Sequence, residues 1–305
     1  AYEIVSRDWS SDVCSSDLSV LNDCINMIKQ PVIDITQDPG LHRTPVRSVL
    51  QISNPIGHLK KYHWVPDKLD KRDYKYSLST KPLASSIDLR RYCSRIEDQG
   101  NLGSCTGQAI AGAIELLNTK NNKQNDISRL FIYYYERALI KTINYDSGAY
   151  IRDGIKVTSQ QGAPLENLWP YDITKFRNKP NSIAISDAVR RRVTLYERVA
   201  NHQGCLDALN NGYPVVIGFK VYSSFESDIV YETGVMPYPN TSRESLLGGH
   251  AVLLVGYDNV RQTYIARNSW GTDWGDSGYF YMPYRVIQNT SMSGDFWIIK
   301  RVNNP

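Results

Sequence analysis

The 305-residue sequence has no run of apolar residues long enough to cross a membrane as a helix. Its longest apolar stretches, such as residues 251–255 and 215–217, have the length of β-strands. An excess of charge of one sign is also missing, because 35 Lys and Arg against 31 Asp and Glu give a net charge of +4, spread along the chain. The sequence therefore excludes a transmembrane helix and predicts neither a nucleic acid nor a membrane as partner.

Cysteine is scarce, with five residues at positions 14, 24, 93, 105 and 205. No two of them have the C-x-x-C spacing of a zinc site or a redox dithiol, so we expect no metal and no cofactor. The lack of a disulfide framework and of a signal peptide favours a reducing, cytoplasmic location. An odd number leaves at least one free thiol, and one reactive thiol is enough for an enzyme's chemistry.

Hydrophobic residues make up 41% of the chain, enough for a substantial core. Residues 1–19 are rich in Ser and Asp and resemble translated sequencing-adapter read-through, so we interpret them as a non-native segment. Residues 20–80 form an N-terminal extension with one helix-like stretch at 20–29 and scattered prolines. Residues 81–305 are predicted to form the folded domain.

The folded domain changes character along its length. Helical periodicity covers residues 107–117, 129–143 and 152–161, and Gly162 is placed to end the third helix. Strand patterns bounded by Gly, Pro and Asn follow at residues 214–221, 250–257, 263–268, 278–282 and 295–300. This segregation of helices and strands predicts an α+β architecture with two lobes.

Cys105 follows Gly100 and Gly103 and comes just before the helical pattern that begins at Gly107. Glycines let the backbone turn tightly, so the thiol is predicted to lie at a helix N-terminus. The N–H groups and the helix dipole at such an end favour an anion and lower the pKa of a thiol. A buried, inert cysteine is the alternative.

A nucleophilic thiol needs a base, and His250 is the best placed of the five histidines. It follows Gly248 and Gly249 and opens an apolar strand, which favours a position in a cleft, with a structural histidine as the alternative. Asn268 ends the next strand pattern. Adjacent antiparallel strands would bring both residues to one end of a sheet, where the amide oxygen of Asn268 would orient the imidazole.

Four elements occur in a particular order: Gln99 six residues before Cys105, then Gly249-His250-Ala251, then Asn268-Ser269-Trp270-Gly271 followed by Trp274-Gly275. Together they resemble the papain-like (C1) cysteine peptidases, including the Cys, His and Asn spacing. Residues 64–67, 73–77, 153–156 and 168–171 resemble a bacterial and viral branch of that family. The resemblance implies a papain-like two-lobed fold, in which a cleft separates a helical lobe from a β-barrel-like lobe.

The resemblance also implies roles for single residues. Cys105 would be the nucleophile, His250 would protonate the leaving amine, and Asn268 would orient His250. Gln99 and the backbone N–H of Cys105 would form the oxyanion hole. Trp270 would shield the bond between Asn268 and His250 from water, with a plain core aromatic as the alternative.

Substrate binding is expected at Ser147, Gly148 and Gly249, where an extended peptide would pair with the backbone. The implied function is hydrolysis of peptide or protein substrates through a covalent acyl-enzyme, by a monomer that acts as an endopeptidase. A catalytically silent binding module and a transpeptidase or ligase using the same acyl-enzyme are the alternatives. Glu226 is interpreted as a solvated surface carboxylate, with a specificity pocket as its alternative.

Two positions depart from the family pattern. Thr106 stands after the nucleophile where an aromatic residue is usual, so the wall beside the thiol differs. Leu102 stands where secreted relatives usually have a disulfide cysteine, so that bridge cannot form. The extension at residues 20–80 occupies the place of an inhibitory propeptide, but it lacks the spaced helix pattern of many propeptides.

Overall fold

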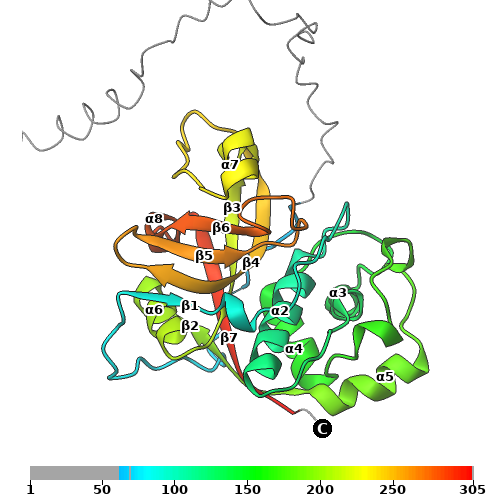
Figure 1. The fold of residues 1–305 in the computed structure, drawn as a ribbon. Helices are drawn as coiled ribbons and strands as arrows, with labels where there is room; N and C mark the ends of the chain where they lie inside the picture. Colours follow the sequence, from blue (N-terminus) through cyan, green and yellow to red (C-terminus); the bar gives the residue numbers. More distant parts are fainter. Residues whose placement is uncertain (1–61, 69, 304–305) are drawn as a thin grey trace, which may run out of the picture. The chain divides into compact units, whose positions relative to one another are not determined.

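The computed structural model describes residues 62–68 and 70–303. The segment at residues 1–19 and the helix-like stretch at 20–29 lie outside the described residues. Strands are concentrated in the second half of the described chain, and helices in the first (Figure 1). The predicted α+β architecture with two lobes is confirmed.

One lobe is built on a seven-stranded antiparallel sheet with the order β2-β7-β3-β4-β5-β6, and β1 pairs with β4 beside this path. Strands β2 and β6 are the two edges of this sheet. Among the described residues they are not paired with each other, so the sheet is not closed into a barrel by hydrogen bonds. The strands are β1 (Ser86–Asp88), β2 (Val193–Val199), β3 (Val215–Tyr222), β4 (Leu246–Asp258), β5 (Thr263–Arg267), β6 (Tyr279–Pro283) and β7 (Ser293–Val302).

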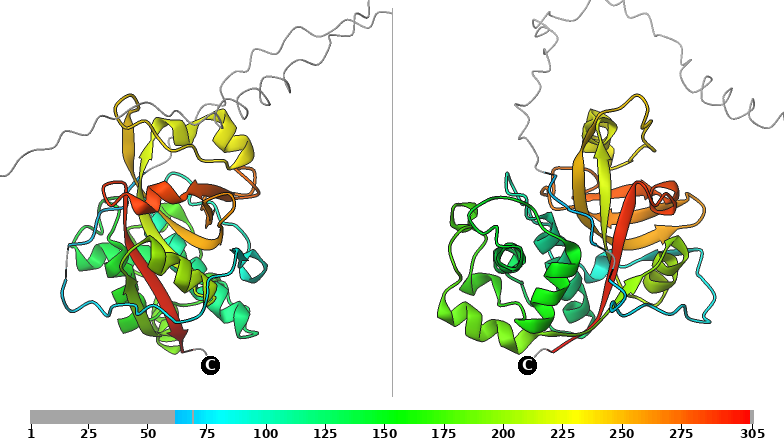
Figure 2. Two further views of the ribbon diagram at one scale, coloured as in Figure 1. Left: turned by 90° about the vertical axis from the view of Figure 1, so that its left-hand side faces the viewer. Right: turned by 180° about the vertical axis from the view of Figure 1, so that it is seen from behind.

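The other lobe consists of the helices α2 (Cys105–Lys120), α3 (Arg129–Leu139), α4 (Ile151–Gln160) and α5 (Ser182–Ala188). Three short helices accompany the sheet: α6 (His202–Asn210), α7 (Asp228–Thr233) and α8 (Tyr284–Gln288). Single 3-10 turns are η1 (Arg90–Tyr92), η2 (Glu166–Leu168), η3 (Ile173–Lys175), η4 (Val189–Arg191) and η5 (Ser223–Glu226). Figure 2 shows β7, drawn in red, running between the helical lobe and the strands β3–β6.

Helix α2 joins the two lobes. It packs against α3 and α4 on one side and against β4 and β7 on the other, and every residue from Cys105 to Asn118 is buried. Gly107 permits the close approach of α3, because a Cβ there would lie 2.9 Å from the carbonyl oxygen of Arg129. A buried ion pair between Arg129 and Glu115, 2.9 Å apart, ties the two helices together. The N-terminus of α2 is therefore held rigidly at the lobe boundary.

The predicted elements differ from the observed ones mainly at their ends. Gly162 follows α4 with a φ of +85°, as expected of a helix stop. β4 begins at Leu246 rather than at residue 250, because Gly248 and Gly249 continue the pairing with β3. β2 and α6 were not predicted, since the polar residues of β2 hide its strand pattern and α6 is short. In the described part of the chain no helix combines the length and apolar character needed to cross a membrane.

The described chain begins with a segment that we call the strap, residues 62–79. Trp64 donates its backbone N–H to the carbonyl of Gly249 (2.8 Å), beside the N-terminal end of α2. Farther along, Tyr76 and Arg198 are joined by a backbone bond of 2.9 Å at the edge of β2. The strap thus passes from the lobe boundary to the outer edge of the sheet.

Candidate active site

Cys105 is the first residue of α2, as predicted from its glycines, and its side chain is fully buried. Burial raises the pKa of the thiol to about 11, although hydrogen bonds from the backbone of Ala251, His63 and Thr106 lower it. The sequence predicted a lowered pKa. The difference arises because the strap and β4 exclude water from the thiol, and desolvation disfavours a thiolate.

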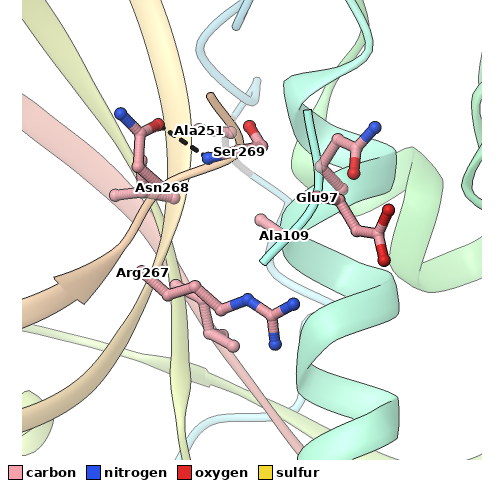
Figure 3. Close-up of a pocket in the computed structure, with 9 residues that line it drawn as sticks. Glu97, Ala109, Ala251, Arg267, Asn268 and Ser269 are labelled. Carbon is pink, nitrogen blue, oxygen red and sulfur yellow. Dashed lines mark hydrogen bonds between the residues drawn. The ribbon is translucent and has the colours of Figure 1, made fainter. Parts of the chain in front are cut away.

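The structure brings His250 and Asn268 together. Ring nitrogen Nε2 of His250 lies 2.8 Å from Oδ1 of Asn268, because β4 and β5 are antiparallel neighbours that pair Leu253 with Arg267. The backbone N–H of Ser269 donates to the same Oδ1 over 2.9 Å (Figure 3), so that atom is an oxygen. An amide oxygen only accepts, and Nε2 therefore carries a hydrogen.

The indole of Trp270 is stacked on the imidazole of His250, with ring centroids 5.0 Å apart and planes 25° apart. Behind it lie Phe225 and Trp274, with centroids 5.5 and 5.0 Å from that of Trp270. His250 and Asn268 are both buried under this aromatic layer. The hydrogen bond between them therefore lies in the protein interior.

Gln99 is buried in the loop that leads to Cys105. Its Nε2 donates to the carbonyl of Leu102 (2.9 Å), and its Oε1 accepts from the hydroxyl of Ser269 (2.6 Å). Because a carbonyl only accepts, the first bond fixes which end of the amide carries the hydrogens. The amide nitrogen of Gln99 thus lies within the loop before Cys105. Its amide oxygen is bonded to Ser269, the residue after Asn268.

The strap covers this site. His63 accepts from the N–H of Ala149 (3.2 Å), and Val65 donates to the carbonyl of Ala149 (3.2 Å). On the other side Trp64 pairs with Gly249, so the strap lies between β4 and the chain before α4 as an added strand. The strap is therefore an extended segment with backbone partners on both sides, and we call the space that it fills between Ala149 and Gly249 the groove.

The three predicted substrate-binding residues have different places around this groove. Gly249 pairs with the strap, and Gly148 admits it, because a Cβ at Gly148 would lie 1.9 Å from the carbonyl oxygen of His63. Ser147 instead directs its hydroxyl to Thr142, 2.7 Å away. Ala149 supplies the backbone pairing. Sequence analysis missed it because the role belongs to its backbone, which no side-chain pattern reveals.

Asp146 is a further residue that sequence analysis missed. Its carboxylate accepts from the backbone N–H of Gly103 (3.0 Å) and from the hydroxyl of Tyr133 (2.6 Å). These bonds tie the loop before Cys105 to the loop before Gly148. Leu102, which stands where secreted relatives usually have a disulfide cysteine, is buried in the same loop. The bonds of Asp146 therefore connect two loops near the place where those relatives have a disulfide.

The other departure from the family pattern, Thr106, contacts a buried acid. Its hydroxyl donates to Oε2 of Glu136 over 2.7 Å. Burial raises the pKa of Glu136 to about 8. The wall beside the thiol is thus polar, where an aromatic residue is usual.

A buried thiol at a helix N-terminus, hydrogen-bonded by the backbone of the residue after His250, and an imidazole bonded to an amide on the next strand are typical of papain-fold cysteine peptidases. The family model described as papain family cysteine protease matches residues 83–296, and the chain belongs to that family. The predicted family and fold are confirmed. Family membership identifies a cysteine-type peptidase that acts on peptides or proteins.

The relatives include viral and bacterial proteins, as the resemblance predicted. A peptidase C1-like protein of Acanthamoeba polyphaga mimivirus is 38% identical over 276 residues, 81% of this chain and 88% of the relative. A cathepsin L-like proteinase of Fasciola hepatica is 29% identical over 223 residues, 68% of this chain and 62% of the relative. The structure of xylellain, a cysteine protease from Xylella fastidiosa, has a TM-score of 0.72 and 38% identity and covers 79% of this chain and 96% of its own.

Proposed function

We propose that Cys105, His250 and Asn268 are the catalytic residues of this peptidase. The thiolate of Cys105 attacks the carbonyl carbon, a sulfur–carbon bond forms, and the carbon–nitrogen bond breaks as His250 protonates the leaving amine. Water, deprotonated by His250, then attacks the acyl-enzyme and releases the acid. The observation that carries the proposal is the bond of 2.8 Å between His250 and Asn268 beside the N-terminus of α2.

The tautomer of His250 supports these roles. Because Nε2 carries a hydrogen toward Asn268, Nδ1 is the nitrogen that exchanges a proton with the thiol and the leaving amine. The stacked Trp270 keeps the ring in this orientation. Asn268 acts as a positioning residue, since it fixes the ring without touching the substrate.

The oxyanion hole is proposed to consist of Gln99 and the backbone N–H of Cys105. An amide nitrogen carries two hydrogens, and the bond from Gln99 to Leu102 uses one of them. The second then serves the oxygen that becomes negative in the transition state. Loss of one such donor costs roughly 10²–10³ in rate, which is the effect expected for Gln99→Ala.

We infer that the extension at residues 20–80 acts as an inhibitory segment and that residues 81–305 form the peptidase domain. The backbone groups of Ala149 and Gly249 that would bind a substrate are paired with the strap. The backbone of His63 also lies against the thiol, whose pKa is raised by burial. Removal of residues 1–66, which keeps residues 67–79 and their contacts with Arg152 and Asp207, should therefore increase peptidase activity; unchanged activity would contradict the inhibitory role.

One chain supplies every group in this mechanism. The thiol is the nucleophile, the imidazole is the acid and base, and the amides stabilise the oxyanion. We therefore propose that a monomer is catalytically complete, without a cofactor, a metal, a nucleic acid or a membrane. Endopeptidase action is part of the same proposal, because residues 63–65, which pair in the groove, are an internal segment of a polypeptide.

The test compares the full chain with Cys105→Ala and Cys93→Ala, using a fluorogenic peptide and a thiol-alkylating agent. Cys93 is a matched control because it is a second free thiol outside the site. Cys105→Ala and alkylation should each abolish cleavage, whereas Cys93→Ala should cleave like the wild type. Cleavage that survives in Cys105→Ala overturns the proposal. Products joined to an added amine, without hydrolysis, would identify a transpeptidase instead.

A further inference from the structure

Tyr62 and Glu226 meet next to the catalytic imidazole. The phenol ring of Tyr62 lies edge-on to His250 and to Trp270, with centroids 6.0 and 5.9 Å away. Its hydroxyl donates a hydrogen bond to Oε1 of Glu226. Burial and this carboxylate raise the pKa of Tyr62 above its ordinary value, so the hydroxyl keeps its proton and remains a donor.

The backbone of His63 lies against the thiol of Cys105. Tyr62 and Trp64 therefore lie on opposite sides of the thiol along the groove. Trp64 leads toward Ala149 and Asp295. Tyr62 lies over the two rings, His250 and Trp270. On the proposed mechanism His250 protonates the leaving amine, and the residue that carries this amine must pass over the imidazole. Tyr62 therefore occupies the position of the residue that follows the scissile bond.

The position of Glu226 is set by its neighbours in the chain. It ends η5, and the preceding residue, Phe225, is buried between Trp270, Trp274 and Phe280. Ser224 is held by a bond of 3.1 Å from its N–H to Glu244. The carboxylate of Glu226 is thus fixed at the rim of the groove although its side chain is exposed.

Gly248 also lies next to Tyr62. A Cβ at Gly248 would lie 2.6 Å from Cβ of Tyr62, so glycine makes room for a side chain here. Among the described residues no basic side chain forms an ion pair with Glu226. Its carboxylate accepts a hydrogen bond from the hydroxyl of Tyr62. A substrate side chain that takes the place of Tyr62 could donate to the same carboxylate.

We propose that Glu226 selects the residue after the scissile bond, favouring a long side chain that ends in a hydrogen-bond donor. Tyrosine is the example that the chain itself supplies, and arginine is its charged counterpart. The inference rests on the proposed function, because it uses the direction of the leaving amine. It replaces the interpretation of Glu226 as a carboxylate that only contacts solvent.

The test uses peptides that differ only after the scissile bond, in two pairs: Tyr with Phe, and Arg with Met. Each pair removes the donor while keeping most of the apolar bulk. A rim-exposed hydrogen bond to a carboxylate should favour Tyr over Phe by about fivefold in kcat/KM, and Arg over Met by a similar factor. Ratios measured within one enzyme cancel any change in how tightly the strap binds.

Glu226→Leu should bring both ratios to about one. Glu226→Gln should retain part of the Tyr preference, because an amide oxygen still accepts, and should lose the Arg preference. Glu232→Gln, an exposed residue of the neighbouring α7, is the control and should leave both ratios unchanged. Ratios in Glu226→Leu that equal those of the wild type overturn the inference. Loss of all cleavage in Cys105→Ala, tested separately, concerns the proposed function alone.

Discussion

Residues 62–65 of the strap pair through their backbone with Ala149 and Gly249, and Trp64 adds a side-chain bond to Asp295, whereas most bonds of residues 67–79 come from charged and polar side chains. In the groove, Trp64 and Val65 donate backbone hydrogen bonds to Gly249 and Ala149. Any extended peptide can make such bonds. The first part of the strap is therefore open to competition by a substrate.

The second part is held by bonds that a substrate cannot reproduce. The guanidinium of Arg152 donates from Nε and from Nη2 to the two carboxylate oxygens of Asp73, over 3.0 and 2.6 Å. Asp67 lies close to Asp295, whose carboxylate is bound by Arg198 at 2.8 Å. Farther along, Tyr76 and Ser79 each bind Asp207 over 2.6 Å. This part, the anchor (residues 67–79), belongs to the stable fold.

The largest effect on stability is expected from a substitution that removes a contact of the anchor. Arg152→Met removes the guanidinium but keeps much of its volume, and it leaves the carboxylate of Asp73 with Arg198, 3.3 Å away, as its remaining cation. Loss of the sole partner of a buried charge costs about 3–5 kcal/mol, and Arg198 offsets part of this cost, so the free energy of unfolding should fall by about 2–3 kcal/mol in urea denaturation.

Arg72→Gln is the matched control for this variant. Arg72 forms an ion pair with Asp70 in the same segment, but its side chain is 86% exposed, so stability should not change measurably. Equal stability of Arg152→Met and the wild type would show that the anchor does not belong to the fold.

The next largest effect is expected at the groove end. Trp64 is buried and its indole N–H donates to Asp295, so Trp64→Ala should detach this end and rehydrate Cys105. The thiol pKa of about 11 should then fall to or below its ordinary value of about 8.5. At pH 8 the thiolate fraction, and with it the alkylation rate, should rise on the order of a hundredfold.

Mass spectrometry of the alkylated chain assigns the reaction to Cys105 among the free cysteines. Leu78→Ala, an exposed position of the strap, serves as the control and should keep the slow rate. If Trp64→Ala and the wild type were alkylated equally fast, the strap would not be the cause of the raised pKa.

A smaller effect follows from Asp67. Burial, and then the neighbouring charge of Asp295, raise the pKa of Asp67 to about 6, against lowering by Trp297 and Arg152. A carboxyl whose pKa is raised on folding stabilises the fold fully below its unfolded pKa of about 4, and this contribution is lost as pH rises to about 6.

Proteolysis of the strap should therefore be slower at pH 4 than at pH 7. Asp73, Asp295, Arg152 and Arg198 face the same cluster. Asp67→Asn should flatten the profile between pH 4 and 7. Strap cleavage that accelerates on acidification in the wild type but not in Asp67→Asn would reverse the expected sign.

The smallest effect is expected for the side chain of His63. Its backbone covers the thiol, while its imidazole lies 3.9 Å from Asp146 and is 32% exposed. Because the backbone remains in His63→Ala, we expect less than about a twofold change in alkylation rate. A change as large as that of Trp64→Ala would mean that the imidazole of His63, and not its backbone, covers the thiol.

Sequence reasoning succeeded where the signal is local. Gly100 and Gly103 before an apolar helix predicted the position of Cys105, and Gly162 predicted the end of α4. It failed for β2, because Glu197 and Arg198 interrupt the apolar alternation that Val193 and Leu195 begin. It also failed for Ala149, because a backbone contact has no residue signature.

The sequence by itself determined the family, the two-lobed order of helices and strands, and the candidate catalytic residues, because these depend on spacing and on short motifs. Only the tertiary structure decided that the strap lies between Ala149 and Gly249, and that Glu226 meets Tyr62 next to His250. Trp64 and Asp295 are 231 residues apart in the chain, and Tyr62 and Glu226 are 164 apart. Contacts across such separations arise from the packing of the whole fold, which no local pattern contains.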